Sequence, residues 1–248
     1  MGKSSILEYL RESASDMRVL GARGIQSESE LPFAALHQLL RPLLGSLEQL
    51  PRDQAGALRG ALGLGAGTES DAYRVALATL TMLAEASDDA PVLCIVDDLH
   101  WIDASSAQVL LFVARRLHAE RLLMIFAARE DELPSVGLEE LRLEPLDAAA
   151  ASSILADRSG ASVADDVAAR VTAATGGNPL AIVELAALLT REQLAGRDPC
   201  PSPLPLSAGV ERLYAERVNA LPEGTRKLLL VAAADDTGMA DVVFAAGR

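Results

Sequence analysis

Two neighbouring carboxylates follow an uninterrupted apolar segment near the middle of the chain. Residues 92–96 are apolar at every position, and Asp97 and Asp98 come directly after them. A strand that is apolar on both faces is typical of a parallel sheet covered by helices, and such sheets bind ligands at the carboxyl ends of their strands. One carboxylate at that place can help to hold Mg²⁺, and the next can orient a water that attacks a phosphate. Alone the pattern is ambiguous, because strands also end in Asp where the chain simply turns.

The first residues of the chain supply the phosphate-binding part of the same chemistry. Gly2-Lys3-Ser4-Ser5 runs directly into an amphipathic pattern that predicts a helix. Gly-Lys-Ser at a helix start is the second half of the phosphate-binding loop G-x-x-x-x-G-K-[ST], in which backbone N–H groups cradle phosphate oxygens. Gly-Lys-Ser is common by chance, so its conjunction with the two carboxylates makes it informative.

The remaining periodicity predicts the elements that position these groups. Strands are expected at 17–22, 92–96 and 122–128, with a short last strand at 141–143. Helices are expected to begin at Pro32, over 73–83, and after Asp103 with Ser105 as the N-cap. Alternating strands and helices indicate an α/β fold with a parallel sheet, and a right-handed crossover then places Asp97 and Arg129 at the same edge.

From residue 146 onward, helical patterns follow one another without strands. They cover 148–156, 163–174 and 180–189, and Gly176-Gly177-Asn178-Pro179 separates the last two as a stop-and-restart signal. Four prolines within 196–205 indicate a linker, and two further helical patterns follow it. The chain therefore divides into an α/β part and a helical part.

Composition narrows the compartment and the partners. The 248 residues carry a net charge of −13, which repels phosphate backbones, so we expect no direct nucleic-acid contact by this chain. A local N–H cradle with one lysine and Mg²⁺ can still hold a nucleotide against that field. The two cysteines form no disulfide framework, and no apolar run has the length of a membrane span or the form of a signal segment. These features predict a cytoplasmic protein without membrane contact.

Several segments of the sequence together resemble those of a known family. Gly2-Lys3-Ser4 resembles a truncated Walker A motif, and residues 92–98 resemble a Walker B motif. Arg129 resembles a sensor arginine, and residues 177–180 resemble the glycine-x-proline motif in the helical lid of STAND-class P-loop ATPases of the AAA type. Longer phrases at 30–44, 97–103 and 175–181 are similar to the ATP-binding region of large bacterial LuxR-type transcription regulators.

The resemblance implies how a nucleotide and its metal would be held. The phosphates would be bound by Gly2, Lys3, Ser4 and Ser5, with the lysine contacting the phosphates directly. Mg²⁺ would be held by the hydroxyl of Ser4 and, through water, by Asp97.

The resemblance also implies catalytic and lid residues. Asp98 would sit beside the attacking water, and Arg129 would sense the γ-phosphate. Gly177 and Pro179 would belong to the nucleotide site, with Pro179 near the adenine. The family commonly has Thr where Ala127 stands, which puts one polar contact in doubt.

These roles imply a domain layout. A P-loop α/β domain with helices on both faces, whose first, central strand is missing from the chain, would cover 1–145, and an all-helical lid would cover 146–195. A Pro-rich linker would cover 196–206, and the start of a winged-helix-like domain would cover 207–248. On this layout the chain is expected to be an internal piece, or a protein whose start was placed too late and whose end is missing. We expect it to bind Mg-ATP weakly or not at all until a preceding strand and the glycine-rich half of the loop are restored.

The function implied is an ATP-binding, slowly hydrolysing switch with ATP, ADP and Mg²⁺ as ligands. It would control a DNA-binding region outside this chain, through other domains of the full-length regulator and in response to an inducer. The resemblance leaves open whether the chain forms an oligomer that depends on nucleotide. The alternative is a protein-interaction scaffold with a degenerate loop that no longer binds nucleotide. A small-molecule kinase is disfavoured, because the sequence shows no acceptor-substrate constellation.

Overall fold

The computed structural model describes residues 2–65, 71–117, 121–129, 137–202, 204, 215, 218–219 and 221–234. By its internal contacts the chain forms two compact units, Gly2–Arg142 and Leu143–Arg248. The candidate phosphate and carboxylate groups all lie in the first unit, and each unit is described by itself below.

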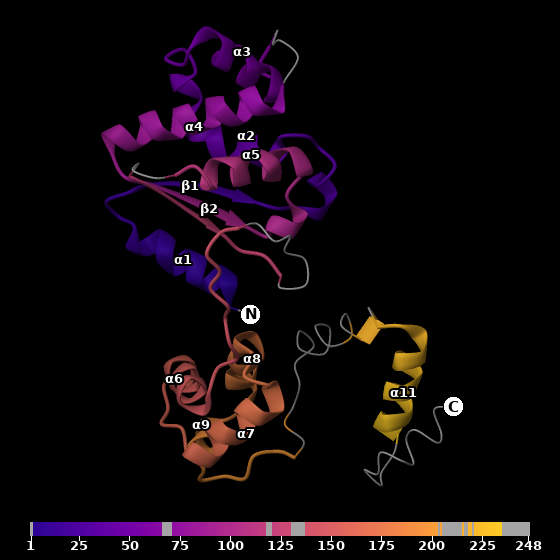
Figure 1. Cartoon of the computed structure of the whole chain (residues 1–248). Helices are drawn as coiled ribbons and strands as arrows, with labels where there is room; N and C mark the ends of the chain where they lie inside the picture. The colour runs from indigo at the N-terminus through magenta and orange to yellow at the C-terminus, as the bar shows by residue number, and fades with distance from the viewer. Residues whose placement is uncertain are drawn as a thin grey trace. The chain divides into compact units, whose positions relative to one another are not determined.

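The first unit is built on a parallel sheet (Figure 1). Its three strands, in spatial order, are β1 (Arg18–Arg23), β2 (Val92–Asp97) and β3 (Leu122–Phe126). The register pairs Arg23 with Asp97 and Val96 with Phe126, so the carboxyl ends of all three strands meet at one edge. The predicted mixed α/β fold and the parallel pairing of the two apolar strands are confirmed.

Helices cover both faces of this sheet (Figure 1). One face carries α1, and the other carries α2, α4 and α5, with α3 packed against α4. The bounds of these helices and of the turns η1 to η3 are α1 (Lys3–Ser13), η1 (Gln26–Glu28), α2 (Ala34–Leu40), η2 (Arg41–Ser46), α3 (Arg52–Ala61), α4 (Ala72–Asp89), η3 (Leu99–Trp101) and α5 (Ala104–Ala114).

The two covered faces explain why β2 is apolar at every position. Leu93 and Ile95 pack with Leu7 in a small cluster beneath α1. Cys94 and Val96 point the other way, into the large core. Successive side chains of a strand alternate between faces, so a strand between two helical layers needs apolar residues throughout. Each buried leucine or isoleucine contributes about 1.5–3 kcal/mol relative to exposure.

Three local predictions were wrong. Helix α5 is capped by Asp103 and not by Ser105, because the carboxylate of Asp103 accepts the N–H of Ser106. Helix α2 begins at Ala34 after a left-handed Phe33, so Pro32 lies outside it. Residues 141–143 form no strand: Leu141 is 85% exposed and lacks the buried face that a sheet strand needs.

The second unit contains a small helical bundle. Its helices are α6 (Ala148–Ser159), α7 (Asp165–Thr175), α8 (Pro179–Leu188) and the short α9 (Arg191–Leu194). The bundle encloses a core that includes Leu155, Ile182 and Leu185. The three predicted helices are confirmed.

A further helix, α11 (Glu223–Ala234), follows the proline-rich segment. Most of the predicted winged-helix-like segment at 207–248 lies outside the described residues. Within the part of the chain that the structure describes, none of the helices combines the length and the apolar character needed to cross a membrane.

Candidate functional site

The amino end of α1 presents backbone N–H groups without a cap. Gly2 precedes the helix in a left-handed conformation (φ 79°), and no side chain caps the first turn. The first N–H groups of a helix have no acceptor within it, and the helix dipole makes this end positive. The first turn, which contains Lys3, Ser4 and Ser5, can therefore receive phosphate oxygens.

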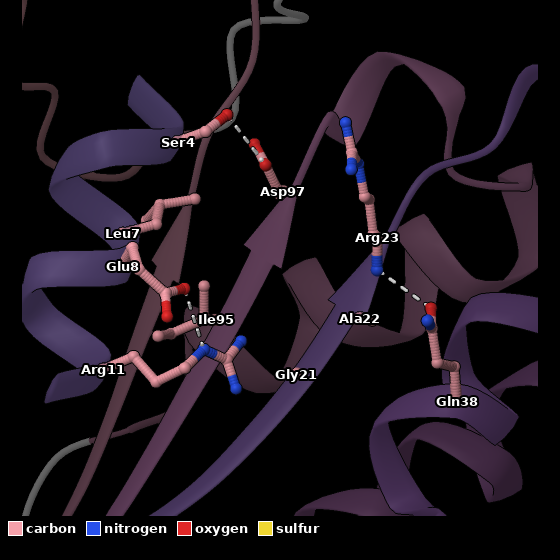
Figure 2. A pocket seen from close by; sticks show the side chains of 10 residues that line it. All are labelled: Ser4, Leu7, Glu8, Arg11, Gly21, Ala22, Arg23, Gln38, Ile95 and Asp97. Carbon is pink, nitrogen blue, oxygen red and sulfur yellow. Dashed lines mark hydrogen bonds and ion pairs between the residues drawn. The ribbon is translucent and has the colours of Figure 1, made fainter. Parts of the chain in front are cut away.

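The hydroxyl of Ser4 connects this helix end to the first carboxylate. Ser4 Oγ donates a hydrogen bond to Asp97 Oδ2 over 3.1 Å, although the two residues lie 93 positions apart in sequence. The other oxygen, Oδ1, accepts the N–H of Asp98 at 2.9 Å. Figure 2 shows Ser4 on α1 facing Asp97 at the tip of β2. A hydroxyl and a carboxylate side by side are the oxygen ligands that Mg²⁺ prefers, so these residues fit the metal.

The second carboxylate is held by an arginine that the sequence analysis missed. Asp98 adopts a left-handed conformation (φ 51°), and its Oδ2 lies 3.3 Å from Arg23 Nε. The pair is partly solvated, with the Arg23 side chain 67% exposed, so its contribution to folding is modest. The parallel register could have revealed it, because Arg23 ends β1 opposite Asp97. The structure therefore brings Ser4, Asp97, Asp98 and Arg23 together.

The backbone after β2 is fixed from both neighbouring strands. We call residues 97–103 the acid loop. Asp97 C=O accepts the N–H of Gly24 at 2.9 Å, and Leu99 donates to Ala127 C=O at 2.8 Å. A Cβ on Gly24 would lie 2.2 Å from Asp98 O, so only glycine allows this approach. The acid loop is thus held in one geometry, with its carboxylates at the sheet edge.

A polar pocket of about 410 Å³ opens beside the Ser4–Asp97 pair (Figure 2). It lies between α1 and β1, and charges of both signs line it. Arg11 and Glu8 approach each other to 3.6 Å on α1, and Gln38 of α2 accepts the N–H of Arg23 at 2.9 Å. Water and small polar groups can therefore reach Asp97 from this side.

The expected sensor residue sits at the same edge but apart from these contacts. Arg129 follows β3 by three residues and is exposed. Within the described residues, the ion pair with Asp98 comes from Arg23 and not from Arg129. Ala127 is buried and donates its N–H to Val96 C=O at 2.8 Å.

The two remaining expected residues lie in the helical unit, in a turn at 176–179 that we call the Gly-Gly turn. Gly177 has φ 68° and accepts the N–H of Leu146 at 2.9 Å; a Cβ there would lie 2.4 Å from Leu146 O. Asn178 caps α8 by accepting the N–H of Leu180, and Pro179 is the first residue of α8. The turn thus joins α7 to α8 and holds the segment before α6.

The cysteine of β2 takes no part in the chemistry. Burial raises the pKa of the Cys94 thiol to about 12, because the apolar core disfavours the thiolate. Cys94 is therefore a core residue and not a nucleophile.

A sequence profile of the AAA ATPase domain family matches residues 1–125. The chain belongs to this family. The matched region of this AAA ATPase domain contains Ser4, Asp97, Asp98 and Arg23, and it ends within β3, before Arg129 and the Gly-Gly turn. Family membership implies a nucleotide-binding module, typically one that uses Mg²⁺. No curated protein matches the chain.

Proposed function

We propose that this AAA ATPase domain is the ATP-binding and ATP-hydrolysing switch module of a LuxR-type transcription regulator. The observation that carries the nucleotide site is the hydrogen bond from Ser4 to Asp97, which joins the open end of α1 to the carboxylate edge of the sheet. The regulator assignment rests on the resemblance of the phrases at 30–44, 97–103 and 175–181.

Each residue of the site has a role in this proposal. The N–H groups of the first turn of α1, with Lys3, bind the phosphates. Ser4 and, through water, Asp97 would hold Mg²⁺, and a metal ion bound there would neutralise charge on the phosphates. Asp98 orients the attacking water, and Arg23 holds the Asp98 carboxylate in place.

The helical unit supplies the response in this proposal. Arg129, which follows β3 in the first unit, would sense the γ-phosphate. Loss of the γ-phosphate removes contacts that favour one arrangement of such modules, and the change passes to other domains. The output is a DNA-binding region outside this chain, and the input is an inducer.

We further propose that a strand beside β3 strengthens binding. Within the described residues β3 pairs only with β2, so its other side is where a further strand can add to the sheet. A strand there, followed by the glycine-rich half of the phosphate loop, adds N–H donors around the phosphates and anchors Lys3.

A metal-dependence experiment tests the proposal. Binding of a fluorescent ATP analogue is measured with Mg²⁺ and with chelator, in the wild type and in Ser4→Ala. We expect Mg²⁺ to tighten binding in the wild type and Ser4→Ala to lose most of that gain, because the hydroxyl ligand is gone. Ser13→Ala, at the other end of α1, is the matched control. Equal Mg²⁺ dependence in all three proteins would refute the metal site. No binding even after a strand and the glycine-rich half of the loop are placed before Gly2 would favour the interaction scaffold.

A further inference from the structure

Asp103, the last carboxylate of the acid loop, has no assigned role, and its environment is unlike that of Asp97 and Asp98. It is only 3% exposed, so almost none of its surface is open to solvent. Burial of a carboxylate is costly unless hydrogen bonds compensate it. Its partners therefore define what it does.

Backbone N–H groups from two helices converge on this carboxylate. Oδ1 accepts the N–H of Ser106 at 2.8 Å, in the first turn of α5, and the N–H of Phe33 at 2.8 Å, before α2. Oδ2 accepts the N–H of Ala35 at 3.2 Å. Ser106 adds a second link, because its hydroxyl accepts the N–H of Leu36 at 2.8 Å. One side chain thus caps two helix ends, and it fixes α2 to the acid loop.

Helix α2 in turn touches the group that holds Asp98. Gln38 of α2 accepts the N–H of Arg23, and the Arg23 guanidinium pairs with Asp98. Gly24, which follows Arg23, packs directly on the backbone of Asp98 and Trp101. These contacts therefore connect Asp103 to Asp98, two residues of the acid loop, through α2 and Arg23.

We propose that Asp103 is a positioning residue for Asp98, acting through the amino end of α2, Gln38 and Arg23. The inference rests on the proposed hydrolysis at the acid loop. When the carboxylate is lost, the Ser106 hydroxyl still links Leu36 to α5, but the residues at 33–35 lose their acceptor. The amino end of α2 then loosens, Gln38 withdraws from Arg23, and Asp98 loses its fixed position. Nucleotide affinity should stay, because α1 and Asp97, which would hold the phosphates and Mg²⁺, do not depend on Asp103.

Two substitutions separate the two caps. In Asp103→Ser the hydroxyl can still accept the N–H of Ser106 in its own helix, but it is too short to reach Phe33 and Ala35. In Asp103→Asn the size is kept and one accepting oxygen remains. Asp71→Ser is the control, because Asp71 is an exposed cap that serves α4 alone through the N–H of Tyr73.

The first readout is catalytic. We expect Asp103→Ser to lower kcat about tenfold with the Mg-ATP dissociation constant within threefold of wild type, Asp103→Asn to lie between, and Asp71→Ser to match wild type. Adding Gln38→Ala to Asp103→Ser should lower kcat no further if both residues act through the same chain of contacts. Wild-type kcat in Asp103→Ser and Asp103→Asn, or an additive effect of Gln38→Ala, would overturn the proposal.

The second readout does not depend on hydrolysis. Trp101 is the chain's one tryptophan and lies inside the acid loop, so its emission reports the local geometry. Asp103→Ser should shift this emission and accelerate amide exchange at 33–36 and at 98–101, whereas Asp71→Ser should change neither. If the wild type does not hydrolyse ATP, the proposed function fails while this readout still decides the positioning. Faster exchange confined to 33–36 would overturn it.

Discussion

The acid loop and the Gly-Gly turn have similar backbone features, but they differ in whether their polar side chains remain available to a ligand. Each contains left-handed residues and relies on a glycine that lets another backbone segment approach, Gly24 for the acid loop and Gly177 for the turn. In the acid loop the side chains of Asp97 and Asp98 end among a hydroxyl, a guanidinium and solvent. In the Gly-Gly turn the one polar side chain, that of Asn178, caps α8.

The difference shows how a rigid backbone can serve two purposes. Where hydrogen bonds from neighbouring strands fix the chain, as at Asp97 and Leu99, side chains remain available for a ligand. Where the turn's own polar side chain makes the fixing hydrogen bond, as Asn178 does, that side chain serves the stability of the fold. We therefore expect substitutions in the acid loop to change chemistry and substitutions in the Gly-Gly turn to change stability.

The largest expected effect is that of Asp98→Asn. Hydrolysis should fall at least about a hundredfold, as when a group that assists proton transfer is lost, while Mg-ATP affinity changes less than threefold. Asp97→Asn, the matched control, should weaken Mg-ATP binding as well, because Asp97 is the proposed carboxylate ligand of Mg²⁺. Single-turnover rates and equilibrium titrations measure the two quantities. If Asp98→Asn loses affinity and rate equally, the division of roles is wrong.

The Gly-Gly turn offers a matched pair for the stability side. Gly177→Ala adds both a strained positive φ and a clash with Leu146, and should destabilise the helical unit by about 2–4 kcal/mol. Gly176→Ala adds only the strain, because nothing lies within 4 Å of its Cβ position, and should cost about 1–2 kcal/mol. Denaturant titration gives both values. Equal losses would mean that the approach of Leu146 is unimportant.

A smaller effect is expected for Arg23→Gln. The ion pair is partly exposed, so stability should change by less than about 1 kcal/mol. Hydrolysis should fall about threefold to tenfold, because Asp98 is no longer held. Arg18→Gln, at the opposite end of β1, is the control and should leave the rate unchanged. A wild-type rate in Arg23→Gln would separate this arginine from the site.

The smallest effect concerns the two cysteines, which report on the two units. Cys94 is buried with a pKa of about 12, so at pH 8 a thiol reagent should label Cys200 quickly and Cys94 only through opening of the sheet. The unfolded chain loses this proton near pH 9.0 and the folded chain retains it up to about pH 12, so stability should fall as pH rises between these values. Fast labelling of both thiols by mass spectrometry would contradict the burial of Cys94.

The sequence was sufficient for those parts that follow from periodicity and from the edge rule of parallel sheets. Residues 92–96 are apolar on both faces, which predicts the central strand of the described sheet, and strand direction then places Asp97 at the ligand-binding edge. Contacts that depend on individual side-chain geometry were not predictable. Neither the reach of Asp103 to two helices nor the pairing of Arg23 with Asp98 leaves a periodic trace.

The central claim is that Ser4 and Asp97 mark a Mg-nucleotide site, and a thermal-shift titration with Mg-ATP tests it most directly. A ligand at a hundred times its dissociation constant adds about 2.7 kcal/mol of stability. We predict a small, Mg²⁺-dependent stabilisation of this chain that Ser4→Ala abolishes. It should grow to roughly that size when a strand and a glycine-rich half-loop precede Gly2. No stabilisation in either protein, or stabilisation that Ser4→Ala leaves unchanged, would contradict the account.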